Sequence, residues 1–307
     1  MNRSVVVLGA TGFLGRHVAG AFEEAGDRVL RVSRSAPPGG APGRAALDLT
    51  AAGPGELAAF LAAHRPDVVV NAAGTVWQAD EERMRALNDT FVRRLVGVLP
   101  ALPTAPRLVQ LGSVHEYGPV PEGTLITEDR APAPVGTYGR TKLRGTEQVL
   151  AAARDGLDAV VVRVTNACGP GAPEQSLPGK VASHLARQAE RRRPVGELRL
   201  APLRARRDFV DVRDVADAVV AAAEPRPGTA GRVFNVARGE AVAARRLVDR
   251  MIELSGLTVR LVEQAPADPV RSAADWQQAD ITLARCLLGW RPRRGLDASL
   301  RDLLASV

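Results

Sequence analysis

The chain is poor in cysteine, lysine and tyrosine, and it has no long apolar run. Its 307 residues include two cysteines, Cys168 and Cys286, which make neither a disulfide framework nor a metal site. The four histidines show no metal-ligand spacing. No apolar stretch approaches the ~18–20 residues of a membrane span, and the run that begins at Val5 is too short for a signal segment. We therefore expect a cytoplasmic protein without a bound metal and without a membrane partner.

Lysine is replaced almost everywhere by arginine. Of the 41 basic residues only Lys142 and Lys180 are lysines, and the formal net charge is +7. Enrichment in arginine and alanine is typical of a GC-rich genome. The basic residues are interspersed with 34 acidic ones along the chain and are not concentrated in a tail. No nucleic-acid-reading motif is present. We expect no nucleic-acid partner, although a mildly positive field suits anionic ligands.

Short apolar runs alternate with helix-like segments through the first half of the chain. This alternation predicts an α/β fold with a doubly wound parallel sheet covered on both faces. After Thr165 the regular pattern ends, which indicates a smaller, mixed α/β substrate lobe. We assign residues 1–165 and roughly 207–240 to the nucleotide domain, and residues 166–206 and 241–307 to the lobe. The expected strands are 5–8, 29–33, 67–71, 108–111 and 159–164, and the expected helices are 13–25, 54–63, 81–98 and 137–154.

A glycine-rich loop joins the first expected strand to the first helix. Its glycines permit a tight turn and close approach of the backbone to a pyrophosphate, while the helix N-terminus offers free N–H donors. In this context the loop predicts a Rossmann-type dinucleotide site; a plain strand–helix turn is the alternative. Its residues are Gly9, Ala10, Thr11, Gly12, Phe13, Leu14 and Gly15.

The end of the second expected strand indicates which dinucleotide binds. Sites that prefer NAD usually place an acid there, which binds the ribose hydroxyls. This chain has Ser33 and Arg34, a hydroxyl and a guanidinium that can bind a 2′-phosphate. We therefore expect NADP(H) in preference to NAD(H). The alternative is that Arg34 is one more solvated arginine.

Tyr138 and Lys142 lie four residues apart on an expected helix and so share a face. The ammonium lowers the pKa of the phenol, which can then exchange a proton with a carbonyl oxygen during hydride transfer. A hydroxyl from Ser113 can orient the same oxygen. With two tyrosines and two lysines in the chain, a chance match has a probability of about one in a hundred. An exposed helix pair is the alternative.

Taken together, these residues resemble the extended short-chain dehydrogenase/reductase family of nucleotide-sugar epimerases, dehydratases and reductases, over essentially the whole chain. The resemblance implies cofactor contacts beyond the glycine loop, as well as contacts of the substrate diphosphate with an asparagine and an arginine. Further matches are the segment Ser113–Gly118, Gly169-Pro170 and the C-terminal signature Leu288–Pro292. The implied cofactor residues are Asp48, Leu49, Ala72, Ala73, Gly74, Asn88, Leu111, Tyr138, Lys142 and Val164. The implied substrate residues are Ser113, His115, Asn166, Arg207 and, more weakly, Arg271.

The chain departs from the family's sugar dehydratases at one informative place. Those enzymes carry an acidic pair directly after the catalytic serine or threonine, whereas this chain has Val114 and His115. This departure argues against a dehydratase, and Ser33 and Arg34 favour a reductase over an epimerase, because NADP(H) usually serves net reduction. The resemblance then implies a dTDP-4-keto-6-deoxyhexose 4-ketoreductase, in a pathway to natural-product or antibiotic deoxysugars. His115 is either a second acid/base group or a residue that lines the sugar pocket.

Three alternative functions stay open. They are a 4-epimerase, a ketoreductase for a non-sugar carbonyl, and an NADP-binding regulator without turnover. The family also implies a homodimer, formed through two helices of which one bears Tyr138.

Overall fold

The large lobe is built on a seven-stranded parallel sheet with the strand order β10-β6-β5-β4-β1-β2-β3. The computed structural model describes residues 2–35, 42–75, 80–190, 196–264 and 276–307. The chain runs outward from β1 to β3, and then returns through β4 to build the other half of the sheet. This reversal between β1 and β4 creates a crevice at the carboxyl ends of the strands, where doubly wound sheets bind ligands. The strands are β1 (Ser4–Leu8), β2 (Arg28–Ser33), β3 (Arg44–Ala46), β4 (Val68–Asn71), β5 (Arg107–Ser113), β6 (Ala159–Val164) and β10 (Val233–Val236).

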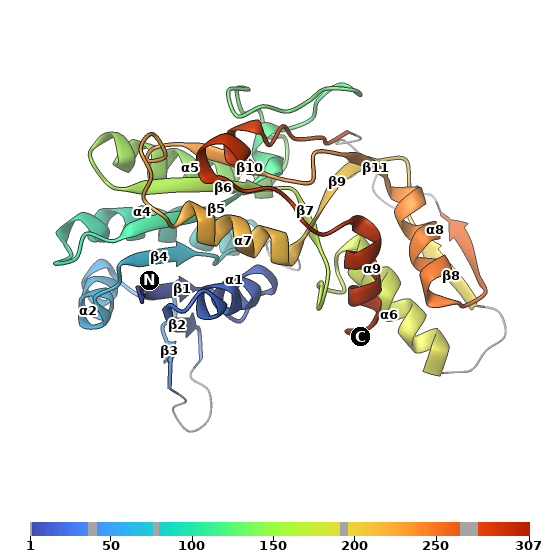
Figure 1. Ribbon diagram of the computed structural model, residues 1–307, viewed down its shortest axis with the longest axis horizontal. Helices are drawn as coiled ribbons and strands as arrows, with labels where there is room; N and C mark the ends of the chain where they lie inside the picture. The colour runs from blue at the N-terminus through green and yellow to red at the C-terminus, as the bar shows by residue number, and fades with distance from the viewer. Residues whose placement is uncertain (1, 36–41, 76–79, 191–195, 265–275) are drawn as a thin grey trace.

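Helices cover both faces of this sheet (Figure 1). The alternation along β1 shows why, because Val5 and Val7 enter one apolar core while Val6 and Leu8 enter the other. Helices α1 and α7 pack together over the first core, whereas α2, α4 and α5 cover the second. The helices are α1 (Phe13–Glu24), α2 (Pro54–His64), α3 (Glu81–Arg85), α4 (Phe91–Val98), α5 (Thr137–Arg154) and α7 (Val212–Ala222).

The smaller lobe lies beside the carboxyl edge of the sheet, on the right in Figure 1. It contains a three-stranded sheet of order β11-β9-β7 and a parallel pair of strands, β12-β8. Strands of both sheets and three helices enclose a third apolar core. Its strands are β7 (Asn166–Cys168), β8 (Gly196–Leu200), β9 (Arg206–Asp211), β11 (Ala241–Ala243) and β12 (Val259–Glu263), and its helices are α6 (Leu177–Glu190), α8 (Ala244–Ser255) and α9 (Leu296–Leu304).

The α/β class, the parallel sheet and the mixed smaller lobe are confirmed. The expected helix 81–98 is wrong in one respect, because a π-helical turn at Ala86–Thr90 separates α3 from α4. The segment 207–240 divides between the lobes: β9 joins the small sheet, whereas α7 and β10 pack with the large one. The two-domain division itself stays a prediction.

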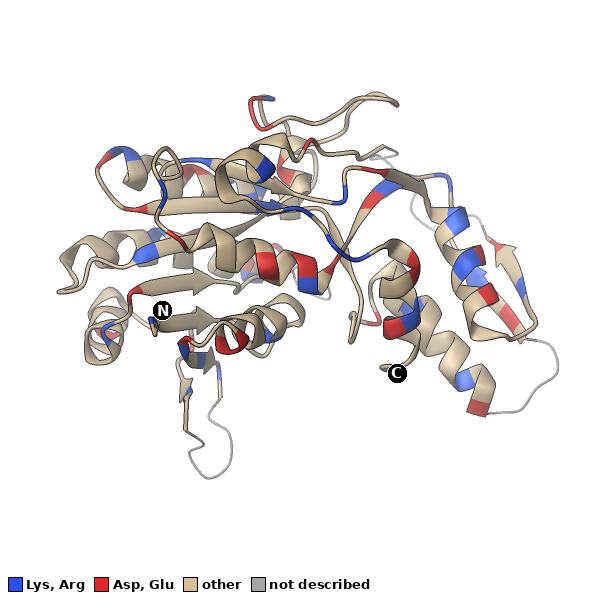
Figure 2. Ribbon diagram, viewed as in Figure 1, with Lys and Arg blue, Asp and Glu red and all other residues tan. Residues whose placement is uncertain are grey.

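Charge is spread over both lobes, with basic and acidic residues interspersed (Figure 2). Within the described ranges no helix is long and apolar enough to cross a membrane. The same ranges hold no group of three or more histidine, cysteine or acidic residues that could bind a metal ion.

Candidate active site

The glycine loop after β1 has the shape that a dinucleotide diphosphate requires. Gly9 has a φ of +79°, and a Cβ atom on it would lie 2.8 Å from the backbone of Ala73. A Cβ on Gly15 would lie 2.2 Å from the Gly9 carbonyl oxygen. The N-cap of α1 is Gly12, which has no side chain to satisfy the N–H groups of the first turn. A diphosphate placed there would meet free donors and the positive end of the helix, so the loop fits the predicted ligand.

A cavity of about 1150 Å³ extends from this loop across the carboxyl ends of β2 and β3. Most of the residues for which the sequence implied a cofactor contact line this cavity. Ser33 and Arg34 lie at one side of it, and Asp48 and Leu49 follow β3. The implied cofactor residues that line it are Gly9, Thr11, Gly12, Ser33, Arg34, Asp48, Leu49, Ala72, Ala73 and Gly74.

The Asp48 loop is held rigidly beside this cavity. One carboxylate oxygen of Asp48 accepts hydrogen bonds from the Thr50 amide (2.9 Å) and the Thr50 hydroxyl (2.6 Å). These bonds, with a smaller contribution from the Arg34 guanidinium, hold the pKa of Asp48 below its usual value. The Arg94 guanidinium donates to the carbonyls of Leu49 (3.3 Å) and Thr50 (3.1 Å) from α4. Sequence reasoning missed Arg94, which lies more than 40 residues from the loop that it holds.

A second cavity, of about 610 Å³, adjoins the first, and Gly12, Ala72, Ala73 and Gly74 line both. It brings together the predicted catalytic residues and those predicted substrate residues that the structure describes. These residues come from five different elements of the chain. They are Ser113, His115, Tyr138, Lys142, Asn166 and Arg207; the same cavity also takes in Phe13, Leu14, Leu111 and Val164. Arg271 lies outside the described residues.

Tyr138 and Lys142 occupy successive turns of α5 at this cavity. The pKa of Tyr138 is raised to about 12 and not lowered as the sequence predicted, because burial outweighs the opposing hydrogen bond with the Ser113 side chain. Lys142 is buried, and its Nζ donates a hydrogen bond to the carbonyl oxygen of Leu111. Burial lowers the pKa of this ammonium, and the negative charge of Glu116 opposes the effect. The phenol is therefore protonated at neutral pH and can act as an acid.

Asn88 lies in the π-helical turn between α3 and α4 and points toward the same side chains. Its Nδ2 donates to the Thr141 hydroxyl at 3.1 Å. Its buried Oδ1 has no hydrogen-bond partner in the part of the chain that the structure describes. A Cβ on Gly74 would lie 3.1 Å from this oxygen and 4.0 Å from Lys142 Nζ. An unpaired buried acceptor in a π-helical turn is typical of a functional site.

Ser113 ends β5 and begins a 3₁₀ turn, Val114–Tyr117, through a capping box. Its hydroxyl accepts a bond from the His115 amide (3.3 Å), and its own amide donates to the Glu116 carboxylate (2.7 Å). The other oxygen of Glu116 accepts from Arg163 Nε at 2.7 Å, and both side chains are buried. The Arg163 guanidinium also lies 4.4 Å from the centre of the Tyr117 ring. This buried pair, which sequence reasoning missed, fixes the position of Ser113.

His115 lines the same cavity as Tyr138 and Arg207. Its ring meets the Tyr138 ring edge to face, with centres 5.8 Å apart. Burial, helped by the positive charge of Arg207, lowers the pKa of His115 to about 4. The imidazole is therefore neutral at physiological pH.

The substrate end of the cavity is tied together by side chains of the smaller lobe. Asn166 Nδ2 donates to the Asp208 carbonyl (3.0 Å) and to Gln277 Oε1 (2.8 Å). The same amide therefore ties β7 to β9, and both of its N–H groups are engaged. Arg16, on α1, donates to the carbonyls of Pro170 and Gly171 and so connects the cofactor loop to the Gly169-Pro170 loop.

Comparison with known proteins agrees with this geometry. The family model "NAD dependent epimerase/dehydratase family" matches residues 5–237. A dTDP-6-deoxy-L-talose 4-dehydrogenase (NAD(P)(+)) of Kitasatospora kifunensis is 43% identical over 304 residues, which are 97% of this chain and 94% of the relative. A UDP-glucose 4-epimerase of Azospirillum brasilense is 30% identical over 98% of this chain and 91% of its own length.

Solved structures show the same fold. RMD of Pseudomonas aeruginosa, solved in complex with NADPH, has a TM-score of 0.82 at 24% identity and covers 99% of both chains. A UDP-glucose 4-epimerase of Thermotoga maritima, solved with UDP-glucose, has a TM-score of 0.85 at 21% identity and covers 99% of this chain and 98% of its own.

Proposed function

The chain belongs to the NAD dependent epimerase/dehydratase family, within the extended short-chain dehydrogenases/reductases, and from this premise we propose that it reduces the C4 ketone of a dTDP-4-keto-6-deoxyhexose with NADPH. The observation that carries the proposal is the convergence of Ser113, Tyr138 and Lys142 on a cavity next to the dinucleotide cavity. The 43% identical relative is named as a 4-dehydrogenase for a dTDP-6-deoxyhexose. Dehydrogenation and ketone reduction are the same interconversion in opposite directions.

The dinucleotide is held by the loop Gly9–Gly15, with Arg34 and Ser33 at its adenosine end. When bound, NADPH supplies the hydride that C4 accepts. In this proposal the sugar lies beside Tyr138 in the neighbouring cavity, and Arg207 binds the diphosphate, since guanidinium donors suit phosphate oxygens. We assign the same role to Arg271. The proposed contact of Asn166 with the diphosphate requires its Nδ2 to exchange the bond to Asp208 or to Gln277 for one to a phosphate oxygen.

The proton comes from Tyr138. As C4 receives the hydride, its oxygen becomes an alkoxide and takes the phenolic proton, which leaves Tyr138 as a phenolate. The nearby Lys142 ammonium stabilises that phenolate. The Ser113 hydroxyl, hydrogen bonded to Tyr138 in the structure, is placed to donate to the same oxygen. Hydride and proton together convert the ketone to a hydroxyl.

The turn after Ser113 lacks the acid and base that loss of water from the sugar would require. Val114 is apolar and His115 is neutral, as its pKa of about 4 requires. Glu116 is the acidic residue of this turn, but both of its oxygens are engaged, one by the Ser113 amide and the other by Arg163. These contacts support a reductase over a dehydratase.

The test is NADPH oxidation, followed at 340 nm, with a panel of nucleotide-linked 4-keto-6-deoxysugars, among which the dTDP sugars should react best. Turnover with a non-sugar carbonyl alone, or NADPH binding without turnover of any ketone, would refute the proposal. A 4-epimerase is the second candidate, which the Azospirillum relative favours. It would co-purify with tightly bound NAD, interconvert 4-hydroxy epimers and oxidise no added NADPH.

The further assignments are proposals as well. They are a role in natural-product deoxysugar biosynthesis, the division of the chain into a nucleotide domain and a substrate lobe, and a homodimer through two helices that include α5. Size-exclusion chromatography with light scattering tests the dimer.

A further inference from the structure

Among the described residues, five arginines line the dinucleotide cavity, and two of them, Arg16 and Arg31, are held by hydrogen bonds. Arg31 donates two hydrogen bonds to Glu23, at 2.9 and 2.7 Å. Arg16 binds backbone carbonyls of the smaller lobe. Arg34 and Arg44 also line the cavity. Within the described ranges, no carboxylate lies within ion-pair distance, 4.0 Å, of either guanidinium.

Arg83 lines the same cavity from α3, but its surroundings differ. Two acidic residues, Asp80 and Glu82, line the cavity beside it. Their negative charge makes that part of the wall a poor place for a phosphate. Arg34 and Arg44 lie on the β2–β3 side, where Asp48 attracts Arg34 and Glu23 attracts Arg44 at longer range, without an ion pair within 4.0 Å among the described residues.

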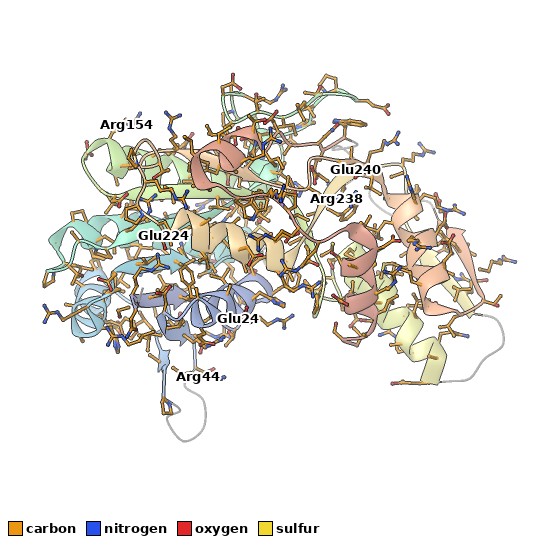
Figure 3. All side chains as sticks on the ribbon, viewed as in Figure 1. Glu24, Arg44, Arg154, Glu224, Arg238 and Glu240 are labelled. Atoms are coloured by element: carbon orange, nitrogen blue, oxygen red, sulfur yellow. The ribbon has the colours of Figure 1, made fainter. Side chains whose placement is uncertain are left out.

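The pairing of β2 with β3 explains how Arg44 reaches the cavity. The two strands are parallel, with Arg31 opposite Arg44 and Ser33 opposite Ala46. Residues directly opposite each other on neighbouring strands project to the same face, so Arg44 shares its face with Arg31 and Ser33. Arg44 is exposed, and Figure 3 labels it on β3, the strand at the end of the sheet opposite β10.

We propose that Arg44 is a second ligand for the 2′-phosphate of NADP(H), so that Arg34 and Arg44 form a two-guanidinium site. This inference rests on the proposed use of NADPH. A phosphate monoester carries a charge of about −1.5 to −2 at pH 7, so one guanidinium leaves part of it uncompensated. A second guanidinium completes the charge balance, and NAD(H), which lacks this phosphate, gains nothing from it.

The experiment uses two adenosine nucleotides that differ only in the 2′-phosphate. Calorimetry measures the Kd of adenosine 2′,5′-bisphosphate and of 5′-AMP for the full-length protein at low salt, where screening is weak. We expect Arg44→Ala to weaken binding of the bisphosphate by about tenfold, the size of one charge-assisted contact, and to leave the Kd of 5′-AMP unchanged. Arg34→Ala should act in the same way. The matched control is Arg28→Ala, an exposed arginine on β2 that does not line the cavity.

Each outcome decides the inference. A bisphosphate Kd that Arg34→Ala raises and Arg44→Ala leaves unchanged overturns the role of Arg44, while the proposed reduction stands. An equal loss in Arg28→Ala shows a general field effect instead of a built site, and overturns it as well. Equal wild-type affinities for both nucleotides overturn the two-arginine site; NADPH turnover of the keto sugars is then measured separately to decide the proposed function.

Discussion

Replacement of Arg163 by leucine tests whether the buried pair with Glu116 builds the site. The Glu116 side chain is 0% exposed and that of Arg163 3%, with 2.7 Å between Oε2 and Nε. Without the guanidinium, the carboxylate would stay buried with only the Ser113 amide as a partner. Removing one member of a buried pair costs about 3–5 kcal/mol. For a chain of this size that lowers the Tm by roughly 6–10 °C, at about 2 °C per kcal/mol.

Differential scanning calorimetry and urea unfolding give the stability change, and NADPH oxidation gives its effect on Ser113. The double variant Glu116→Gln/Arg163→Leu should be more stable than Arg163→Leu alone, because no uncompensated charge is left. A control is Arg187→Leu, because the side chains of Arg187 and its partner Glu174 are 50% and 56% exposed and loss of this pair should cost under ~1 kcal/mol. The reasoning fails if Arg163→Leu costs under ~1 kcal/mol, or if adding Glu116→Gln recovers nothing.

Four further results are expected. Tyr138→Phe should lower kcat by ~10²–10⁴-fold with NADP⁺ affinity intact, since only the proton donor is lost; stopped-flow absorbance checks this. Arg34→Ala should raise the KM for NADPH far more than that for NADH, and an unchanged ratio would contradict the 2′-phosphate assignment. Arg207→Ala should weaken dTDP binding in calorimetry while the Kd of NADP⁺ holds. Reduction in D₂O should leave carbon-bound hydrogen at C3 and C5 unexchanged by NMR, because His115 is a weak base.

Local patterns were enough to predict much of the site. The glycine loop and the Tyr138–Lys142 spacing depend only on neighbours in sequence. Residues Gly9–Leu14 of the loop line the two adjoining cavities, and Tyr138 and Lys142 line the second. Contacts across the sheet could not be predicted in this way. Glu116 meets Arg163 because β5 and β6 pair with Ser113 opposite Val164, and Arg44 reaches the cofactor cavity because β3 pairs with β2. Sequence periodicity does not give the register of parallel strands.

The π-helical turn is a similar case. The segment 81–98 has a continuous helical pattern, yet the structure inserts a wider turn at Ala86–Thr90. That turn holds Asn88 where its Nδ2 bonds Thr141 on α5 and its Oδ1 stays unpaired. The hydrophobic pattern predicts which residues of a helix pack inward. It does not predict the one extra residue that widens an α-helical turn into a π-helical turn. The insertion lies at the residue that the family resemblance, and not the periodicity, had indicated.

The environment of His115 bears on the choice of reaction. Burial, with a smaller contribution from the positive charge of Arg207, lowers the pKa of His115 to about 4. Base strength falls with pKa, so an imidazole tuned this low is poorly suited to remove a proton beside the ketone. It is equally unsuited to act as a general acid near neutral pH, because almost none of it is protonated. Tyr138, with its pKa raised to about 12, is thus left as the proton donor of this pair. The burial of His115, more than the charge of Arg207, therefore supports the proposed plain ketone reduction over epimerisation next to the carbonyl.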